Sequence, residues 1–428
     1  KQSRGQQGIG ISAAGMYGHL TTGKPITAIS RTAKGKPAHA FDIRINTRSN
    51  EPEILRDEEV DFDLDHGTQV EIELEGIYKR GKRSVDEYLQ ATAVANPHCQ
   101  VTFIAPDGEK AFYPRAAEEL PIEAREIKPH PHGVELGMLM KIIQDTRAPT
   151  IKSALTSDFS RVSDKVSTEL LKEANISVRK KPRDAMPAEI ERLHKIIQKK
   201  QLLAPPTNCL SPIGEDLLRT SLESRYECEL VFTRTRRPAV YRGNPFQIEV
   251  GLAYGGKLPV DALAEVLRLA NRVPLQYQAN AGAIAKAVMG VDWKNYGLQQ
   301  ARGALPSGPM VICVHIASAW VPFTSESKEA VAHYPEIVKE MRLALQDCGR
   351  ELARHIRSKR RAAEELKKRS YIEKYIPHIG IALKEILELS DKDEMKIIET
   401  LRDTLERSRT RVQVKGNVEL ALAEELDG

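Results

Sequence analysis

A glycine-rich segment placed directly before a helical pattern is the feature that most restricts how this chain folds. Gly5, Gly8 and Gly10 give the spacing G-x-x-G-x-G, and Gly23 followed by Pro25 predicts the end of the helix after it. The apolar positions of that helix are Ala13, Met16, Tyr17 and Leu20. Free N–H groups at a helix start, beside residues without Cβ atoms, suit a phosphate group, although a plain surface loop can have the same spacing.

Composition limits the class of protein. With 428 residues the chain is long enough for about three domains, and 41% hydrophobic with 29% charged residues is typical of a soluble protein. No apolar run approaches the roughly 18 residues of a membrane span. The formal net charge of +5 is mild, so a nucleic-acid role depends on local basic patches. Far-apart cysteines fit reduced cytosolic thiols rather than a disulfide framework or a zinc site; they are Cys99, Cys209, Cys228, Cys313 and Cys348.

Alternating apolar residues after the helix predict an antiparallel sheet. The alternation is clear over residues 41–45 and again over residues 70–74. A Lys-Gly-Lys-Pro turn over residues 34–37 joins the first two strands. Gly67 and Thr68 stand where the last strand should begin.

Together, RGQQGIGISAA, the sheet and HGTQVEIEL resemble the later half of a GHKL-type ATPase domain. In that family the glycine segment ends the ATP lid, its amides wrap the triphosphate, and the Gly-Thr motif lies near the adenine. The resemblance implies that the catalytic Glu, the Mg²⁺-binding Asn and the Asp-x-Gly-x-Gly adenine motif precede Lys1. We therefore expect the chain to begin inside the lid, to bind ATP analogues weakly and not to turn over ATP alone.

Helical patterns fill residues 134–204, in pieces broken at Pro149, Asn175 and Pro187. A Pro-His-Pro-His-Gly run over residues 129–133 leads into them. The close histidines suggest a metal site, but the prolines predict rings that point apart, and no Cys or carboxylate cluster completes a site. A basic run over residues 179–183 falls in a loop. It suits DNA phosphates better than the mixed-charge helix predicted from about Pro335 to Lys368, which is followed by a shorter helical tail.

Six motifs stand in an order that resembles the B subunits of topoisomerase VI, the archaeal type IIB DNA topoisomerases. They are the glycine segment, KPHPHGVE, LSPIGED, NPFQIEVGLAYGG, ANRVPLQY and DWKNYG. The resemblance covers nearly the whole chain, apart from the tail beyond about Leu389. It implies an α+β multidomain fold. The implied parts are the partial GHKL (Bergerat) ATPase α/β sandwich over residues 1–118, an all-α helix-two-turn-helix insert over 119–207, an α/β transducer domain of ribosomal-protein-like βαβ fold with a long C-terminal helix over 208–370, and a helical tail over 371–428.

The same resemblance implies an ATP site, with ATP and Mg²⁺ as cofactors, but no catalytic residue and no metal ligand within the chain; the Mg²⁺ ligand would lie upstream. The phosphate-wrapping stretch is Gly5, Gln6, Gln7, Gly8, Ile9, Gly10, Ile11 and Ser12. Thr68 matches the threonine on the adenine side. Lys294, in DWKNYG, matches the transducer's switch lysine, which reaches the γ-phosphate when the domains close; the alternative is a solvated lysine beside a core tryptophan. By analogy with related DNA-repair folds, the helical insert implies DNA contacts at Arg179, Lys180, Lys181 and Arg183.

The implied function is that of an ATP-hydrolysing subunit of a type II DNA topoisomerase. ATP binding dimerises two B subunits, and one duplex then passes through a transient double-strand break made by the A subunit, which relaxes supercoils and decatenates DNA. The implied partners are the A subunit, a second B subunit in a heterotetramer, and double-stranded DNA, with no membrane, in the cytoplasm at the archaeal nucleoid. Two alternatives are another GHKL ATPase, of mismatch-repair or chaperone type, and a non-catalytic DNA-binding scaffold.

Overall fold

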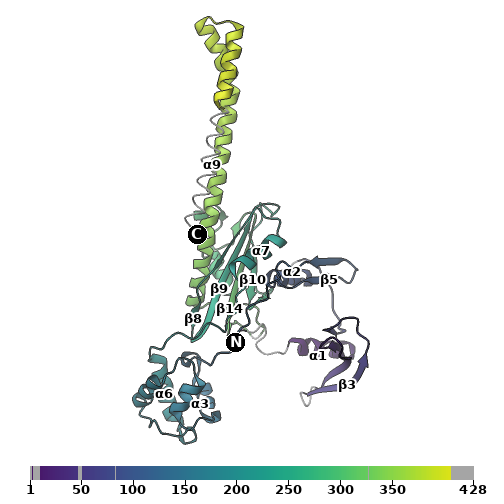
Figure 1. Ribbon diagram of the computed structural model, residues 1–428, viewed down its shortest axis with the longest axis vertical. Coiled ribbons are helices and arrows are strands. Elements are labelled where there is room, and N and C mark those ends of the chain that lie inside the picture. The colour runs from purple at the N-terminus through teal and green to yellow at the C-terminus, as the bar shows by residue number, and fades with distance from the viewer. Residues whose placement is uncertain (1, 3–9, 47–50, 82, 326, 406–428) are drawn as a thin grey trace. The chain divides into compact units, whose positions relative to one another are not determined.

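A computed structural model describes residues 2, 10–46, 51–81, 83–325 and 327–405 (Figure 1). The chain divides into two compact units. One consists of Lys1–Asp292 and Leu298–Cys348, and the other of Trp293–Gly297 and Gly349–Gly428. Helices and sheets are both present in the described residues, so the mixed α and β class predicted from the sequence is confirmed.

The N-terminal body is a helix with a four-stranded antiparallel sheet, in the strand order β3-β2-β1-β4. Its elements are α1 (Gly10–Thr22), β1 (Ile26–Arg31), β2 (Ala38–Asn46), β3 (Glu51–Val60) and β4 (Gly67–Glu71). Gly23 and Gly35 have φ of +75° and +81°, which favours glycine at the helix end and in the turn between β1 and β2. The predicted helix, turn and start of the last strand are confirmed.

Helix α1 packs through two glycines rather than through its apolar face. A Cβ on Gly15 would lie 2.0 Å from Ile26 Cδ1, and one on Gly18 would lie 2.6 Å from the carbonyl oxygen of Glu73. Both glycines are buried, whereas Leu20 is 74% exposed and Tyr17 is 51% exposed. The face buried in this structure is therefore not the apolar one, because the small residues allow the helix backbone to approach the sheet closely.

A helix and a hairpin follow: α2 (Val85–Ala95), β5 (Val101–Ile104) and β6 (Lys110–Tyr113). The side chain of Ser84 caps α2 by accepting a hydrogen bond from the N–H of Glu87 at 3.2 Å. Gly108, with φ of +85°, forms the turn between the two strands.

The helical body confirms the predicted run of short helices. Its elements are η1 (Pro131–Gly133), α3 (Leu136–Asp145), α4 (Ile151–Asp158), α5 (Asp164–Glu173), η2 (Pro182–Asp184) and α6 (Pro187–Lys199). Pro187 is the first residue of α6, where its missing N–H costs nothing, and Asn175 has φ of +55° just after α5. The core is built from apolar side chains at most 1% exposed: Leu139, Ile143, Ile151, Leu155, Leu170, Leu171, Leu193 and Ile197.

The central sheet of the first unit has the strand order β11-β10-β14-β9-β7, with β8 paired to β9. Its elements are α7 (Glu215–Arg225), β7 (Leu230–Thr235), β8 (Ala239–Tyr241), β9 (Asn244–Tyr254), β10 (Glu265–Ala270), β11 (Val273–Pro274), α8 (Gly282–Met289) and β14 (Met310–Ser318). Strands β10 and β14 run parallel, a pairing that needs a crossover such as the one through α8. Strand β14 lies between β10 and β9 in the sheet (Figure 1).

Helix α7 covers one face of this sheet. Leu218 and Leu222 of α7 share a core with Ala253, Leu269 and Cys313 of the sheet. Side chains alternate along β9, so Glu249 and Gly251 point to that same face. A Cβ on Gly251 would lie only 2.4 Å from Leu222 Cδ1, which explains a glycine in the middle of a buried strand.

The remaining elements are η3 (Trp293–Tyr296), β12 (Gln299–Gln300), β13 (Pro306–Ser307) and the 53-residue helix α9 (Pro335–Leu387). The prediction that the long helix ends near Lys368 is wrong, because it continues through Pro377 to Leu387. A second helix over residues 391–405 supports the added turns. Lys384 forms ion pairs with Asp391 and Glu394, and a Cβ on Gly380 would lie 2.5 Å from Ile398.

All five cysteines are free thiols, as predicted. Cys209, Cys313 and Cys348 are buried, whereas Cys99 and Cys228 are partly exposed. Burial raises the pKa of the Cys209 and Cys313 thiols, which keeps both protonated and unreactive.

Candidate nucleotide and DNA sites

The predicted phosphate-wrapping stretch is only partly within the described residues. Gly5, Gln6, Gln7, Gly8 and Ile9 lie outside them. Gly10, Ile11 and Ser12 form the first turn of α1 and are exposed. Among the described residues, no heavy atom lies within 4 Å of a Cβ built on Gly10.

Thr68 lies on the face of the sheet that α1 covers. It stands opposite Ser30 of β1, and the two hydroxyl oxygens are 3.0 Å apart. Ser30 shares its face with Ile26, the residue that meets Gly15 of α1, because side chains two apart on a strand point the same way. The structure therefore brings α1 and Thr68 to one side of the sheet.

Lys294 belongs to the second unit, on a turn that is fixed against α9. The side chain of Trp293 is fully buried, and its ring meets that of Tyr296 edge to face at 6.0 Å. A Cβ built on Gly349 of α9 would lie 2.7 Å from carbon atoms of the Tyr296 ring, so this ring packs against the backbone of α9. Lys294 itself is an exposed residue of this turn.

The histidines of the Pro-His-Pro-His-Gly run are structural. The prediction that the rings of His130 and His132 point apart is wrong, because the two rings meet edge to face with 5.0 Å between their centroids. His132 Nε2 lies 3.1 Å and 2.9 Å from the carbonyl oxygens of Ile197 and Lys200, and His130 Nε2 lies 3.0 Å from that of Leu203. His132 thus meets carbonyl groups at the end of α6, and His130 meets one in the segment that follows the helix. Among the described residues no group of His, Cys, Asp and Glu could hold a metal ion.

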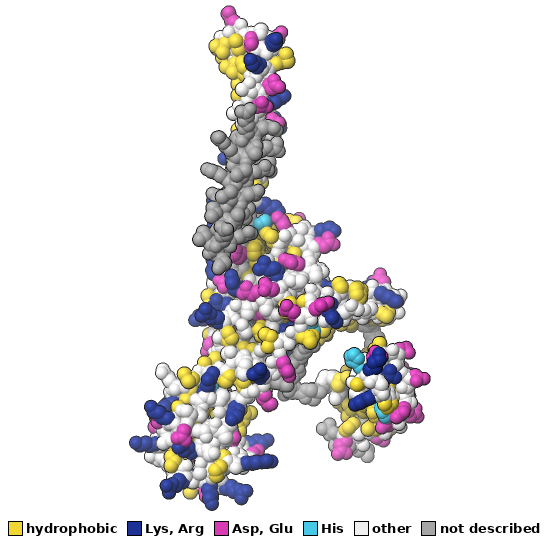
Figure 2. Space-filling model, viewed as in Figure 1, with side chains coloured by type: hydrophobic (Ala, Val, Ile, Leu, Met, Phe, Trp, Pro, Cys, Tyr) yellow, Lys and Arg dark blue, Asp and Glu magenta, His cyan; other side chains and the backbone are white. Residues whose placement is uncertain are grey.

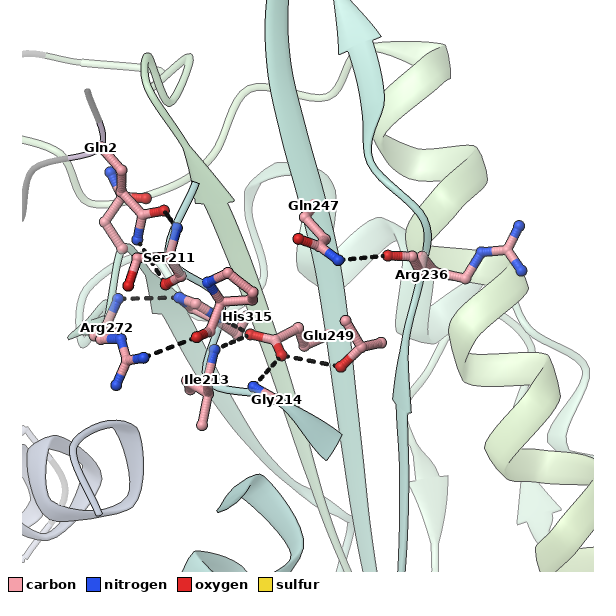
Figure 3. Close-up of polar contacts among 12 residues, drawn as sticks. Gln2, Ser211, Ile213, Gly214, Arg236, Gln247, Glu249, Arg272 and His315 are labelled. Atoms are coloured by element: carbon pink, nitrogen blue, oxygen red, sulfur yellow. Dashed lines mark hydrogen bonds and ion pairs between the residues drawn. The ribbon is translucent and has the colours of Figure 1, made fainter. Parts of the chain in front are cut away.

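A buried polar network in the central sheet went unnoticed in the sequence (Figure 3). Glu249 and His315 stand opposite each other on β9 and β14, with 2.7 Å between Oε2 and Nδ1. Glu249 also accepts hydrogen bonds from the N–H groups of Ile213 and Gly214, both at 2.7 Å, and from the Thr235 hydroxyl at 3.0 Å. The signal that could have revealed the pair is one polar residue in the middle of each apolar strand, QIEVGLAY and VICVHIAS.

The hydrogen bonds fix the protonation of this pair. The N–H of Arg272 donates to His315 Nε2 at 3.0 Å, so that nitrogen carries no proton. The proton is therefore on Nδ1, which donates it to Glu249, and the imidazole is neutral. Burial raises the pKa of Glu249, but the hydrogen bond from His315 and the N–H groups of Ile213 and Gly214 lower it more, so the carboxylate is charged.

Three of the four predicted DNA-contacting residues are exposed on the helical body. Arg179, Lys181 and Arg183 are exposed in the segment between α5 and α6, as predicted. Lys180 is not available in the same way, because its Nζ lies 2.7 Å and 2.5 Å from the two carboxylate oxygens of Glu189. That pair is only 20% and 14% exposed, so Lys180 serves the fold.

Positive charge gathers around this run. Residues 131–200 contain 14 Lys and Arg but only 9 Asp and Glu. Figure 2 shows many Lys and Arg side chains, in dark blue, over the surface of the helical body. In the same view the part that contains the central sheet carries both basic and acidic side chains. The mixed-charge part of α9 behaves as expected of a solvated face, with Arg354 paired to Glu351 at 2.6 Å and Arg360 paired to Glu364 at 3.1 Å.

Comparison with known proteins gives the family. Residues 205–368 match the family model described as the topoisomerase VI B subunit, transducer. The chain is 36% identical to the B subunit of type 2 DNA topoisomerase 6 from Pyrococcus horikoshii, a match that covers 99% of this chain and 81% of that one. The chain belongs to the topoisomerase VI B-subunit family.

Other relatives in the topoisomerase VI B-subunit family are more similar in sequence. The relative from Methanococcoides burtonii is 45% identical and that from Archaeoglobus fulgidus 44% identical, with 91% and 93% of this chain covered. The chain spans 62% and 65% of the length of these two relatives.

Among solved structures, the B subunit of DNA gyrase from Myxococcus xanthus matches over 77% of this chain and 67% of that one, at 13% identity and a TM-score of 0.30. None of the described helices is both long and apolar enough to cross a membrane.

Proposed function

We propose that this chain is the nucleotide-responsive part of a topoisomerase VI B subunit. ATP binding dimerises two B subunits, and one DNA duplex passes through a transient double-strand break that the A subunit makes in another, which relaxes supercoils and decatenates DNA. The observation that carries the proposal is the 36% sequence identity to a relative of this family, in a match that covers 81% of that relative's length. The family assignment sets aside the mismatch-repair and chaperone alternatives.

Each part of the proposed nucleotide site has a distinct task. Backbone N–H groups of Gly5–Ser12 donate to phosphate oxygens, at the helix end that favours negative charge. Thr68 supplies a hydroxyl on the adenine side. Lys294 pairs with the γ-phosphate only while the two domains are closed, so loss of that phosphate removes its partner and releases the closed state. ATP itself supplies the phosphate charge and the bond that is hydrolysed.

The Mg²⁺ expected with ATP finds no fitting donor set among the described residues. Asp, Glu and His side chains do not gather there as a metal site. We therefore assign no step to a metal held by these residues, and the proposed roles of Gly10, Thr68 and Lys294 do not depend on one.

The proposal assigns two further surfaces to partners. Exposed Arg179, Lys181 and Arg183 suit the phosphates of double-stranded DNA, which attract cations without regard to sequence. The far part of α9 suits the A subunit, because Tyr371, Ile372 and Tyr375 expose between 47% and 64% of their surface there. We place the complex, as two A and two B subunits, at the nucleoid in the cytoplasm.

The test is reconstitution of the full-length B subunit with its A subunit. Supercoiled and catenated DNA should be relaxed and unlinked only when both subunits and ATP are present. Calorimetry with a non-hydrolysable ATP analogue should show binding to the full-length B subunit. A full-length protein that binds DNA but no nucleotide would instead support the remaining alternative, a non-catalytic DNA-binding scaffold.

A further inference from the structure

Gln2 is fastened to the segment that leads into α7 (Figure 3). Its backbone N–H donates to the Cys209 carbonyl at 2.9 Å. Its side-chain Nε2 donates to the Ser211 carbonyl at 3.2 Å, and the Ser211 N–H donates to Gln2 Oε1 at 2.7 Å. The side-chain amide of Gln2 thus pairs with the backbone of Ser211 through two hydrogen bonds. We name the segment Cys209–Gly214 the strap.

The buried network holds the other side of the strap. The N–H groups of Ile213 and Gly214 are two of the donors to Glu249. The Pro212 carbonyl accepts a hydrogen bond of 2.8 Å from the Arg272 guanidinium. All of these contacts use backbone atoms of the strap, so they depend on its path rather than on its side chains.

Arg272 ties the strap to the pair of buried side chains. Asn271 and Arg272 have φ of +48° and +66° in the turn between β10 and β11, a conformation uncommon for arginine. The N–H of Arg272 donates to His315, and its guanidinium donates to the strap. The contacts of one residue therefore connect the strap to the far side of the Glu249–His315 pair.

The strap cannot shift without a penalty at a buried charge. Glu249 and His315 are fully buried, and Ser211 is 8% exposed, so water cannot readily replace a missing partner. A movement of the strap would take two N–H donors from the Glu249 carboxylate and an acceptor from Arg272. A displacement of Gln2 is therefore passed to the sheet rather than absorbed by the strap.

We propose that Gln2 is a positioning residue, which couples the glycine segment to the central sheet through the strap. This inference rests on the proposed function, because the segment that begins at Gly5, three residues after Gln2, is the proposed phosphate loop. Gln2 has no contact with the nucleotide in this proposal. It fixes the point from which the phosphate loop starts, so the nucleotide state of that loop reaches Glu249.

The test compares three variants of the full-length B subunit, with and without a non-hydrolysable ATP analogue. Gln2→Ala removes both side-chain hydrogen bonds to Ser211. Gln2→Glu keeps the acceptor but places a second oxygen against the Ser211 carbonyl. Gln247→Ala is the matched control, because Gln247 Nε2 also donates to a backbone carbonyl, that of Arg236 at 2.9 Å, without touching the strap (Figure 3). Hydrogen exchange is followed at the amides of Ser211, Ile213 and Gly214, and ATP hydrolysis is measured with the A subunit and DNA.

In wild type and Gln247→Ala, the analogue should slow exchange at Ile213 and Gly214. In Gln2→Ala and Gln2→Glu the analogue should still bind, but exchange at these amides should no longer respond to it. The kcat for ATP hydrolysis should fall about tenfold, with KM for ATP little changed. A full exchange response in both Gln2 variants overturns the inference. Failure of the wild-type protein to bind the analogue would instead overturn the proposed function.

Discussion

Glu249 Oε2 lies 2.7 Å from His315 Nδ1 on the neighbouring strand, and neither side chain is exposed to solvent. Because the Arg272 N–H occupies the other imidazole nitrogen, the histidine is neutral and the carboxylate carries the only charge of the pair. Four donors reach that carboxylate, three of them besides His315. The sheet thus keeps a buried charge that the strap helps to satisfy.

We predict that Glu249→Gln destabilises the protein by about 3 kcal/mol at pH 7, because a buried group loses its charge and faces donors with an NH₂ group. The pKa of Glu249 lies below its ordinary value of 4.5, so its stabilisation is complete above that value and is lost as the pH falls through the lower, folded pKa. The difference in the free energy of unfolding between wild type and Glu249→Gln should therefore become smaller below about pH 4.5. Urea unfolding from pH 3 to pH 7 measures it, and a gap constant over that range would contradict the assignment.

Gly251→Ala should destabilise the first unit by about 1–3 kcal/mol, because the added Cβ would lie 2.4 Å from Leu222 Cδ1. In a Leu222→Ala background the Gly251→Ala change should destabilise less than it does in the wild type, since the clash is then removed. Urea unfolding of the four members of this cycle gives the coupling. Gly137→Ala, on an exposed position of α3 with no atom within 4 Å of the new Cβ, is the control and should be neutral or stabilising.

Replacing Arg179, Lys181 and Arg183 with alanine should weaken binding to duplex DNA nearly equally for all sequences. The slope of log affinity against log salt should fall by about one for each phosphate that the variant no longer neutralises. Lys180→Ala should leave that slope unchanged and instead lower the unfolding free energy, because Glu189 loses its ion-pair partner. If the triple variant and wild type have equal slopes of log affinity against log salt, residues 179–183 form an ordinary solvated loop that does not contact DNA.

Lys294→Ala should abolish most ATP-driven strand passage while the fold stays intact. An exposed lysine contributes within about 0.5 kcal/mol to stability, whereas loss of one charged partner in a closed site costs about 2–5 kcal/mol. Lys294→Arg should rescue poorly, because a planar guanidinium does not replace a compact ammonium. Relaxation of supercoiled DNA, ATP hydrolysis and thermal melting of the full A–B complex are the measurements.

Lys328→Ala is the variant with which the effect of Lys294→Ala on strand passage is compared. It is half-buried on a loop closed by the Phe323–Val331 bridge and has φ of +56°. If Lys328→Ala stops strand passage and Lys294→Ala does not, the switch role belongs to the loop of Lys328 and the assignment of Lys294 is wrong.

Local rules were enough to predict most pieces of the fold, but not the end of the long helix or the contacts between the pieces. Turn chemistry placed Gly35 and Pro187 correctly, because the first depends on its own φ and the second on its own missing N–H. Periodicity found helix α1 but not the face it buries, since that depends on how closely the backbone at Gly15 can approach Ile26. A local pattern cannot report such an approach.

The candidate site divides in the same way. Thr68 was assigned because its Gly-Thr pair matches a motif of the family, and its role on the adenine side stays a prediction. Glu249 and His315 were missed because their meaning lies in the register of β9 against β14, which brings residues 66 positions apart into one pair. Lys180 looked equivalent to its basic neighbours in sequence, and only the fold of α6 brings Glu189 to it.

The five thiols differ in burial, so a thiol reagent can label some native cysteines and not others. Cys209, Cys313 and Cys348 are sealed in cores, whereas Cys99, between α2 and β5, and Cys228, between α7 and β7, remain accessible to a maleimide reagent. Spin or fluorescent probes on these two native side chains would report the distance between the hairpin and the sheet, in the presence and absence of nucleotide. Movements within the protein could then be followed by spectroscopy without replacing a single amino acid.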